Sequence, residues 1–198
     1  MLSLSNTIQG VISYTWPMIL ISVVIIVSLR IAYLIKMKEK FIIYKELISL
    51  SFVIYILCLF QVVTFQDGVT WSTNNFIPFR EILRYNMGSR LFFKNVIGNM
   101  LMFMPYGLFI SFYLKNKKAN LTLILTLVAS FSIEVVQMVI GRVFDIDDII
   151  LNLLGGYLGY LIYYLFCKIW EKIPSVFKNE LFLNIVSIFL LMSIIILL

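Results

Sequence analysis

Six long apolar runs constrain this chain more than any other feature, because each is about as long as a helix that crosses a bilayer. The runs occupy residues 16–35, 47–65, 95–114, 121–140, 148–167 and 181–198. Within lipid a backbone must satisfy its own polar groups, in helices or in a closed barrel whose strands would alternate apolar and polar residues. The unbroken runs therefore predict an all-α integral membrane protein, with a bundle of about six transmembrane helices as a single domain over residues 1–198.

The composition supports this class and excludes several kinds of chemistry. Hydrophobic residues make up 62% of the chain and charged residues only 13%, far from the averages of soluble domains. No histidine occurs, which excludes histidine acid-base catalysis and histidine metal ligands. Cys58 and Cys167 fall in different apolar runs, so we expect small hydrophobic side chains and no disulfide.

The basic residues predict the orientation, since short loops rich in lysine stay in the cytoplasm. The connections after the first, third and fifth runs carry ten lysines, namely Lys36, Lys38, Lys40, Lys45, Lys115, Lys117, Lys118, Lys168, Lys172 and Lys178. Both termini are therefore predicted to face outward. This asymmetry also explains the net charge of +6, so we expect no nucleic-acid partner.

The long outer connection between the second and third runs contains the segment "FIPFREILRYNM". Its apolar residues at helical spacing are Phe79, Ile82, Leu83 and Met87. Arg80 and Arg84 fall on another face, which is typical of a helix lying in the membrane interface. We predict a short interfacial helix whose arginines either hold lipid phosphates or simply face solvent.

The third and fourth runs carry polar residues at membrane depth. Asn95 and Asn99 are spaced i, i+4 near the outer end of the third run, and Pro105 with Gly107 predicts a kink or break further in. Packing alone also explains the proline and glycine.

Glu134 is the residue that lipid would reject most strongly. It lies on one face with Gln137, about 10 Å inside the fourth helix by helical rise. A carboxylate facing lipid there would cost up to a few kcal/mol, so it must turn inward. It is then either protonated because of burial, or ionised and paired, with Arg142 as the nearest arginine in sequence.

The segment "GRVFDIDDIILNLLGGYLGY" opens the fifth helix. Asp145, Asp148 and Asn152 follow i, i+3, i+7 spacing and share a face, with Asp148 expected to begin the helix. Capping of the helix end is an alternative role for each aspartate. Gly155 and Gly159 form a small-xxx-small pattern that lets another helix approach closely.

Chain order places these polar residues at one depth, because the third helix enters from outside, the fourth leaves to the outside and the fifth re-enters. We therefore predict one polar cluster in the outer leaflet, comprising Asn95, Asn99, Glu134, Gln137, Arg142, Asp145, Asp148 and Asn152.

These segments resemble the VanZ family of membrane proteins, which is associated with resistance to the glycopeptide teicoplanin. The matching pieces are "NNFIPFREI", "NVIGNMLMFMPYG", "SIEVVQ" and "GRVFDIDDIILNLLGGYLG", and together they define a VanZ-like core over residues 74–160. The resemblance implies a multi-pass protein of the bacterial cell membrane that reduces susceptibility to lipid-tailed glycopeptides. Its characteristic polar positions fall here on Asn75, Asn95, Asn99, Glu134, Gln137, Arg142, Asp145, Asp148 and Asn152.

Three mechanisms remain open at this point. In the first, the cluster binds the polar headgroup of a membrane lipid, a cell-wall precursor or the lipoglycopeptide, with Arg142 and Arg80 or Arg84 holding the anionic part. In the second, an intramembrane enzyme acts on a lipid-linked substrate, using Glu134, Asp145 or Asp148 as general base or holding a divalent cation between them. In the third, the cluster only locks helices together in a scaffold for cell-wall synthesis proteins.

Overall fold

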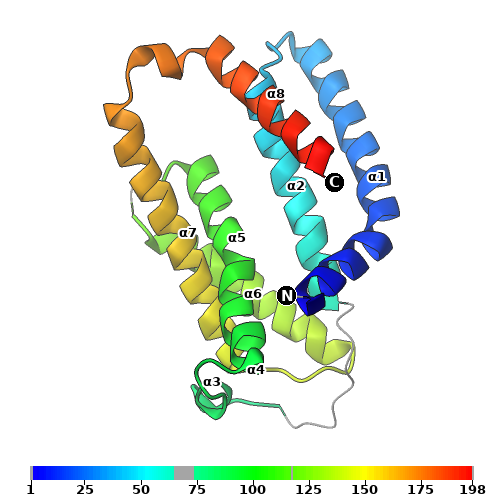
Figure 1. Ribbon diagram of the computed structural model, residues 1–198, viewed down its shortest axis with the longest axis vertical. Coiled ribbons are helices and arrows are strands. Elements are labelled where there is room, and N and C mark those ends of the chain that lie inside the picture. Colours follow the sequence, from blue (N-terminus) through cyan, green and yellow to red (C-terminus); the bar gives the residue numbers. More distant parts are fainter. Residues whose placement is uncertain (1, 65–73, 117, 198) are drawn as a thin grey trace. The chain divides into compact units, whose positions relative to one another are not determined.

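Helices dominate the part of the chain that the computed structural model describes, residues 2–64, 74–116 and 118–197 (Figure 1). The elements are α1 (Leu2–Met37), α2 (Ile43–Thr64), α3 (Arg80–Arg84), α4 (Arg90–Phe92), η1 (Phe93–Ile97), α5 (Gly98–Leu114), α6 (Asn120–Val139), α7 (Ile146–Lys172), η2 (Ser175–Lys178) and α8 (Glu180–Leu197). Of these, η1 is a π-helical turn and η2 a 3₁₀ turn. The predicted all-α class is confirmed.

Five helical segments in the described part of the chain are long and apolar enough to cross a membrane. They are Trp16–Met37, Ile43–Val63, Arg90–Leu114, Asn120–Val139 and Ile146–Lys172. Each corresponds to a predicted span, although α1 already begins at Leu2. The sixth predicted span, 181–198, ends beyond the residues whose side chains are described. Within the described residues, α8 provides the shorter apolar segment Glu180–Ser193.

The chain divides into two compact units. The first unit joins Met1–Val62 with Lys172–Leu198, and the second is Val63–Glu171. The predicted core over 74–160 lies inside the second unit, whereas the single transmembrane domain over 1–198 stays a prediction.

Polar contacts join the helices of the first unit. Arg30 on α1 and Glu46 on α2 form a two-bond ion pair, with Nε–Oε2 and Nη2–Oε1 distances of 2.9 Å. The backbone N–H of Tyr44 donates to Oδ1 of Asn184 on α8 at 3.1 Å. Most apolar side chains of Trp16–Met37, the part of α1 whose side chains are described, are exposed, as expected for a helix that faces lipid.

In the second unit, α6 has a polar face turned inward and an apolar face turned outward. The buried residues of α6, called here the α6 stripe, are Thr122, Thr126, Ser130, Glu134 and Gln137. On the other face Ile124, Val128 and Phe131 are more than half exposed, with values of 57%, 58% and 52%. A helix on the surface of a soluble protein has the opposite distribution, with its apolar face buried and its polar face exposed. The exposed apolar face of α6 therefore indicates a lipid-facing surface.

Glycines bring α5 and α7 together at backbone distance. A Cβ on Gly155 would overlap the backbone of Met100, and one on Gly159 would overlap the backbone of Met104. The close helix approach predicted from Gly155 and Gly159 is therefore confirmed. The same contact explains Gly107 of α5, where a Cβ would overlap the backbone of Gly156.

Pro105 and Gly107 allowed either a kink or break in this helix or packing alone. The expected break at Pro105 is not found, since α5 continues through it from Gly98 to Leu114. The packing alternative is supported for Gly107, because a Cβ there would overlap the backbone of Gly156 on α7. The irregular turn lies instead at Phe93–Ile97.

The short helix predicted in the outer connection is present but smaller. The helix α3 ends at Arg84, because Tyr85 adopts an extended backbone with φ −90° and ψ 127°. Met87 therefore lies outside α3 and is 90% exposed. Leu83 lies within α3 and is 81% exposed.

Candidate functional site

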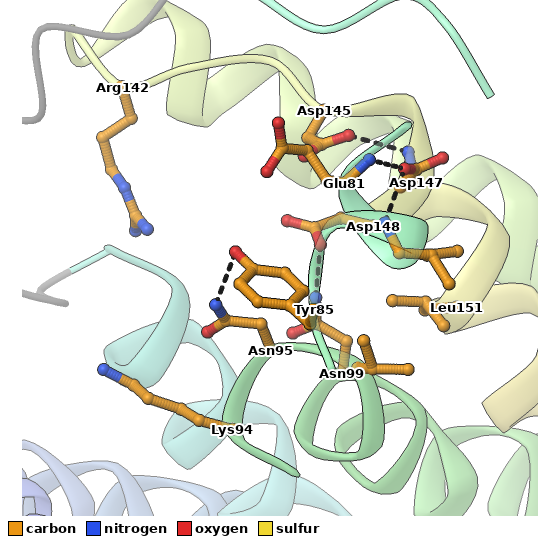
Figure 2. Close-up of a pocket in the computed structure, with 12 residues that line it drawn as sticks. Glu81, Tyr85, Lys94, Asn95, Asn99, Arg142, Asp145, Asp147, Asp148 and Leu151 are labelled. Atoms are coloured by element: carbon orange, nitrogen blue, oxygen red, sulfur yellow. Dashed lines mark hydrogen bonds between the residues drawn. The ribbon is translucent and has the colours of Figure 1, made fainter. Parts of the chain in front are cut away.

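A polar cavity of about 190 Å³ opens in the second unit (Figure 2). Its walls come from three parts of the chain: the α3 region, the start of the α4–η1–α5 helix, and the segment that leads into α7. The lining residues are Glu81, Ile82, Tyr85, Lys94, Asn95, Val96, Asn99, Arg142, Asp145, Asp147, Asp148 and Leu151.

Asn75 clamps the segment before α3 to the segment before α7. Its backbone N–H donates to the carbonyl of Phe144 at 2.8 Å, and its own carbonyl accepts from the N–H of Ile146 at 3.0 Å. Its side-chain Nδ2 donates to Oδ1 of Asp145 at 2.8 Å. Asn74 adds a fourth bond, accepting from the N–H of Phe144 through Oδ1 at 3.0 Å. Asn75 thus positions the cavity wall without lining the cavity.

Asp147 anchors α3 on α7. It is 1% exposed, and its carboxylate accepts from the backbone N–H groups of Phe79, Glu81 and Ile82. These donors lie at the start of α3, so an aspartate far away in sequence caps this helix. Sequence reasoning missed Asp147 because it lies off the face shared by Asp145, Asp148 and Asn152.

Asp145, and not Asp148, caps the start of α7. The helix begins at Ile146, and Oδ1 of Asp145 accepts from the N–H of Asp147 at 2.9 Å. The prediction that Asp148 begins the helix was wrong, since the cap formed three residues earlier. Burial raises the pKa of the Asp145 carboxyl above its ordinary value, and the charges of Asp147 and Glu81 add to the rise. The Asp147 N–H and the Asn75 amide oppose it by donating hydrogen bonds.

Glu134 lies behind the cavity and braces its wall. It is 1% exposed, and its Oε2 accepts from the backbone N–H of Asp145 at 2.9 Å. The predicted inward orientation of Glu134 is confirmed. Gln137 reaches another part of the unit, where its Nε2 donates to the carbonyl of Val63 at 3.3 Å.

Arg142 forms hydrogen bonds within the protein and also lines the cavity. Its Nη1 donates to the carbonyl of Val63 at 2.6 Å, and its backbone N–H donates to the carbonyl of Gln137 at 2.9 Å. It nevertheless lines the cavity, and Figure 2 shows its side chain extending into the open space. These bonds hold the cationic group in a defined place.

The π-helical turn brings Lys94 and Asn95 to the cavity together with Asn99. Nδ2 of Asn99 donates to Oδ1 of Asp148, and Nδ2 of Asn95 donates to the hydroxyl of Tyr85 at 2.8 Å. Single π turns are frequent at functional sites. The predicted convergence of the third and fifth helices is thus present in the structure.

The predicted site residues separate into two groups. Five of them line the cavity: Asn95, Asn99, Arg142, Asp145 and Asp148. Six do not: Asn75, Arg80, Arg84, Glu134, Gln137 and Asn152.

The second group has other surroundings. Arg80 is exposed, and Arg84 forms an exposed ion pair with Glu81 at 3.2 Å. Asn152 is 4% exposed and donates through Nδ2 to Oγ of Ser130 at 2.9 Å. Lys94 and Tyr85 line the cavity although sequence reasoning did not select them, and the only signal was their closeness to Asn95 and Arg84 in the chain.

No group of three histidine, cysteine, aspartate or glutamate residues could hold a metal ion within the part of the chain that the structure describes. The divalent cation considered from sequence therefore lacks a three-carboxylate site there.

These features define a multi-pass helical membrane protein with a small polar cavity at the ends of packed helices. The chain matches the family described as VanZ/LLP1 over residues 52–167, more than half of its length, and it belongs to that family. The predicted family is confirmed, and its predicted core over 74–160 falls within the matched residues.

One relative is Protein VanZ of Enterococcus faecium. The two are 34% identical over 73 residues, which cover 36% of this chain and 45% of the relative. The chain thus spans less than half the length of this relative. No solved structure matches the chain.

Proposed function

We propose that this VanZ-family protein reduces susceptibility to teicoplanin-type lipoglycopeptides by binding a polar headgroup in its cavity. The observation that carries the proposal is the convergence of Lys94, Asn95, Asn99, Arg142 and Asp148 on one open space. Polar groups that border a cavity can be reached by a ligand, whereas groups enclosed within the protein cannot.

Each side chain has a part in this proposal. Lys94 and Arg142 hold an anionic group such as a phosphate or carboxylate, and the amides of Asn95 and Asn99 orient it. Lys94 here takes the place that sequence reasoning assigned to Arg80 or Arg84. The resemblance to the VanZ family supports the link with lipid-tailed glycopeptides, and the predicted orientation puts the cavity at the outer leaflet.

The size of the cavity favours a headgroup over a whole antibiotic. Its volume of about 190 Å³ lies below the roughly 300–1,000 Å³ of pockets that enclose drug-sized ligands. A single headgroup fits this space, while an attached lipid tail can lie along the apolar outer surface of the helices.

The test uses the full chain expressed in a glycopeptide-susceptible bacterium. We expect it to raise the inhibitory concentration of teicoplanin more than that of a glycopeptide without an acyl chain. Lys94→Gln and Arg142→Gln should each lose most of this protection, and Arg90→Gln, which removes an exposed arginine outside the cavity, should keep it. Protection that persists in both cavity variants would contradict the proposal.

Membrane abundance of every variant is measured in parallel. In the scaffold hypothesis, protection falls only where abundance falls. Reduced protection at normal abundance in Lys94→Gln, whose side chain is exposed, favours the binding site.

A second candidate is an enzyme acting on a lipid-linked envelope substrate. It is favoured by the presence of two carboxyl groups, Asp145 and Asp148, on the wall of one cavity. Incubation of purified protein with a labelled lipid-linked substrate distinguishes the two candidates, because a binder returns the ligand unchanged and an enzyme releases a product.

A further inference from the structure

We propose that the headgroup bound in this cavity is a zwitterion, carrying an anionic group and a protonated amine close together. This inference rests on the proposed function and adds the chemical class of the ligand. It follows from the charges on the cavity wall, their separation and the volume between them.

The charges lie on different sides of the cavity. In Figure 2, Arg142 and Lys94 lie toward one side, and the carboxyl groups of Asp145, Asp148 and Glu81 lie toward the other. Tyr85 and Asn95, joined by their hydrogen bond of 2.8 Å, lie between the two sides. A ligand that fills this space meets both signs of charge.

The carboxyl groups on the acidic side can accept a hydrogen bond from a further donor, and a purely anionic ligand does not supply one. Asp147 is engaged by three backbone N–H groups, and Glu81 pairs with Arg84 at 3.2 Å. Asp145 accepts from the Asn75 amide and from the backbone N–H of Asp147, both through Oδ1, and Asp148 accepts from the Asn99 amide through Oδ1. A carboxylate has about four lone-pair sites, so both can also accept from an ammonium group.

Electrostatics disfavours a purely anionic ligand here. Four carboxyl groups and two cationic side chains line the cavity. Where Asp145 and Asp148 are ionised, they would repel a phosphate held by Lys94 and Arg142 unless the ligand brings its own positive charge. An amine beside the phosphate removes this repulsion and adds charge-assisted hydrogen bonds.

Two sources provide this chemistry in a small group: the headgroup of an ethanolamine phospholipid, and the end of a peptide that carries free amino and carboxylate groups. The cavity of about 190 Å³ suits either of them. The experiment separates these sources by their probes.

The experiment uses the purified full chain in detergent and isothermal titration calorimetry. Short-chain phosphatidylethanolamine should bind about tenfold more tightly than phosphatidylglycerol of the same chain length, a difference of about 1.4 kcal/mol, because its ammonium group adds charge-assisted hydrogen bonds. Phosphatidylcholine, whose quaternary ammonium cannot donate a hydrogen bond, should bind with an intermediate affinity. Glycylglycine is titrated as the peptide probe, and its competition with phosphatidylethanolamine would assign the site to zwitterions from either source.

Asp148→Asn should lose most of the preference for phosphatidylethanolamine while its affinity for phosphatidylglycerol stays the same or improves. Glu180→Gln removes an exposed carboxylate on α8 and should leave both affinities unchanged. Because the lipid series on the unmodified chain needs no variant, poor folding of Asp148→Asn does not prevent the test.

The two proposals fail in different ways. Saturable binding of all three lipids with equal affinity overturns the zwitterion and leaves the headgroup site standing. No saturable binding of any lipid or of glycylglycine overturns both.

Discussion

The α6 stripe and the cavity wall contain similar polar residues and use them differently. In the stripe, Glu134 accepts from the backbone of Asp145 at 2.9 Å, and Ser130 accepts from Asn152 at 2.9 Å. All five stripe residues are at most 8% exposed. On the cavity wall, Asn99 and Asp148 bond to each other but remain only half-buried, beside an open volume.

This difference teaches that polarity at membrane depth does not by itself mark a ligand site. Residues whose hydrogen bonds are completed within the protein lock helices together, and residues that border empty space can serve a ligand. Variants should therefore separate into those that remove folded protein and those that remove function from folded protein.

The largest effect is expected where helices meet through glycine. Gly155→Ala places a Cβ against the backbone of Met100, which cannot rotate away as a side chain would. We expect a loss of about 3 kcal/mol in the free energy of unfolding and a clear fall in membrane abundance. Gly98→Ala is the matched control, because its Cβ would meet only the carbonyl oxygen of Phe93 at 3.6 Å. Equal abundance and melting temperature in the two variants would contradict the packing described for α5 and α7.

The next largest effect is expected at Asp147. Asp147→Asn replaces one acceptor oxygen by a donor, so one or more N–H groups at the start of α3 lose their partner. We expect about 2 kcal/mol of local destabilisation, seen as faster amide hydrogen exchange at residues 79–82. Asp148→Asn changes the neighbouring residue in the same way and should leave exchange in α3 unaltered. Similar exchange in both variants would remove the distinction between anchor and cavity wall.

A smaller effect on stability is expected for Glu134→Gln. The glutamine oxygen can still accept from the N–H of Asp145, but the other carboxyl oxygen is replaced by a buried NH2 group that needs acceptors. We expect the free energy of unfolding to fall by about 1 kcal/mol, with protection against teicoplanin falling only in proportion to abundance. Asp148→Asn should show the reverse, with normal abundance and reduced protection. If the Glu134→Gln protein is abundant yet gives no protection, Glu134 has a role in function and not only in joining the helices.

The smallest effect concerns pH. The pKa of Asp145 is raised by burial above its ordinary 3.8, so the folded state holds this proton more tightly than the unfolded state. The resulting stability is fully present below pH 3.8 and is lost as the pH rises through the raised pKa. Thermal melting of the purified chain should therefore show a decline over this window of less than about 1 kcal/mol, because solvent screens a half-buried group. In Asp145→Asn this decline should disappear, and an unchanged decline would assign it to another carboxyl group.

The sequence was sufficient for the fold class, five of the spans, the family and the cavity residues Asn95, Asn99, Arg142, Asp145 and Asp148. These features are local. Hydropathy over about 20 residues identifies a span, and a spacing of three or four residues places side chains on one face.

Only the tertiary structure separated the predicted cluster into an α6 stripe and a cavity wall. It also replaced Arg80 and Arg84 by Lys94 as a cavity residue and gave Asp147 its role as an anchor. The physical reason is that each of these assignments depends on backbone groups far away in the chain. The clamp between Asn75 and Asp145 turns α3 toward α7, and the π turn at Phe93–Ile97 brings Lys94 to the cavity, so neither placement follows from helical spacing alone.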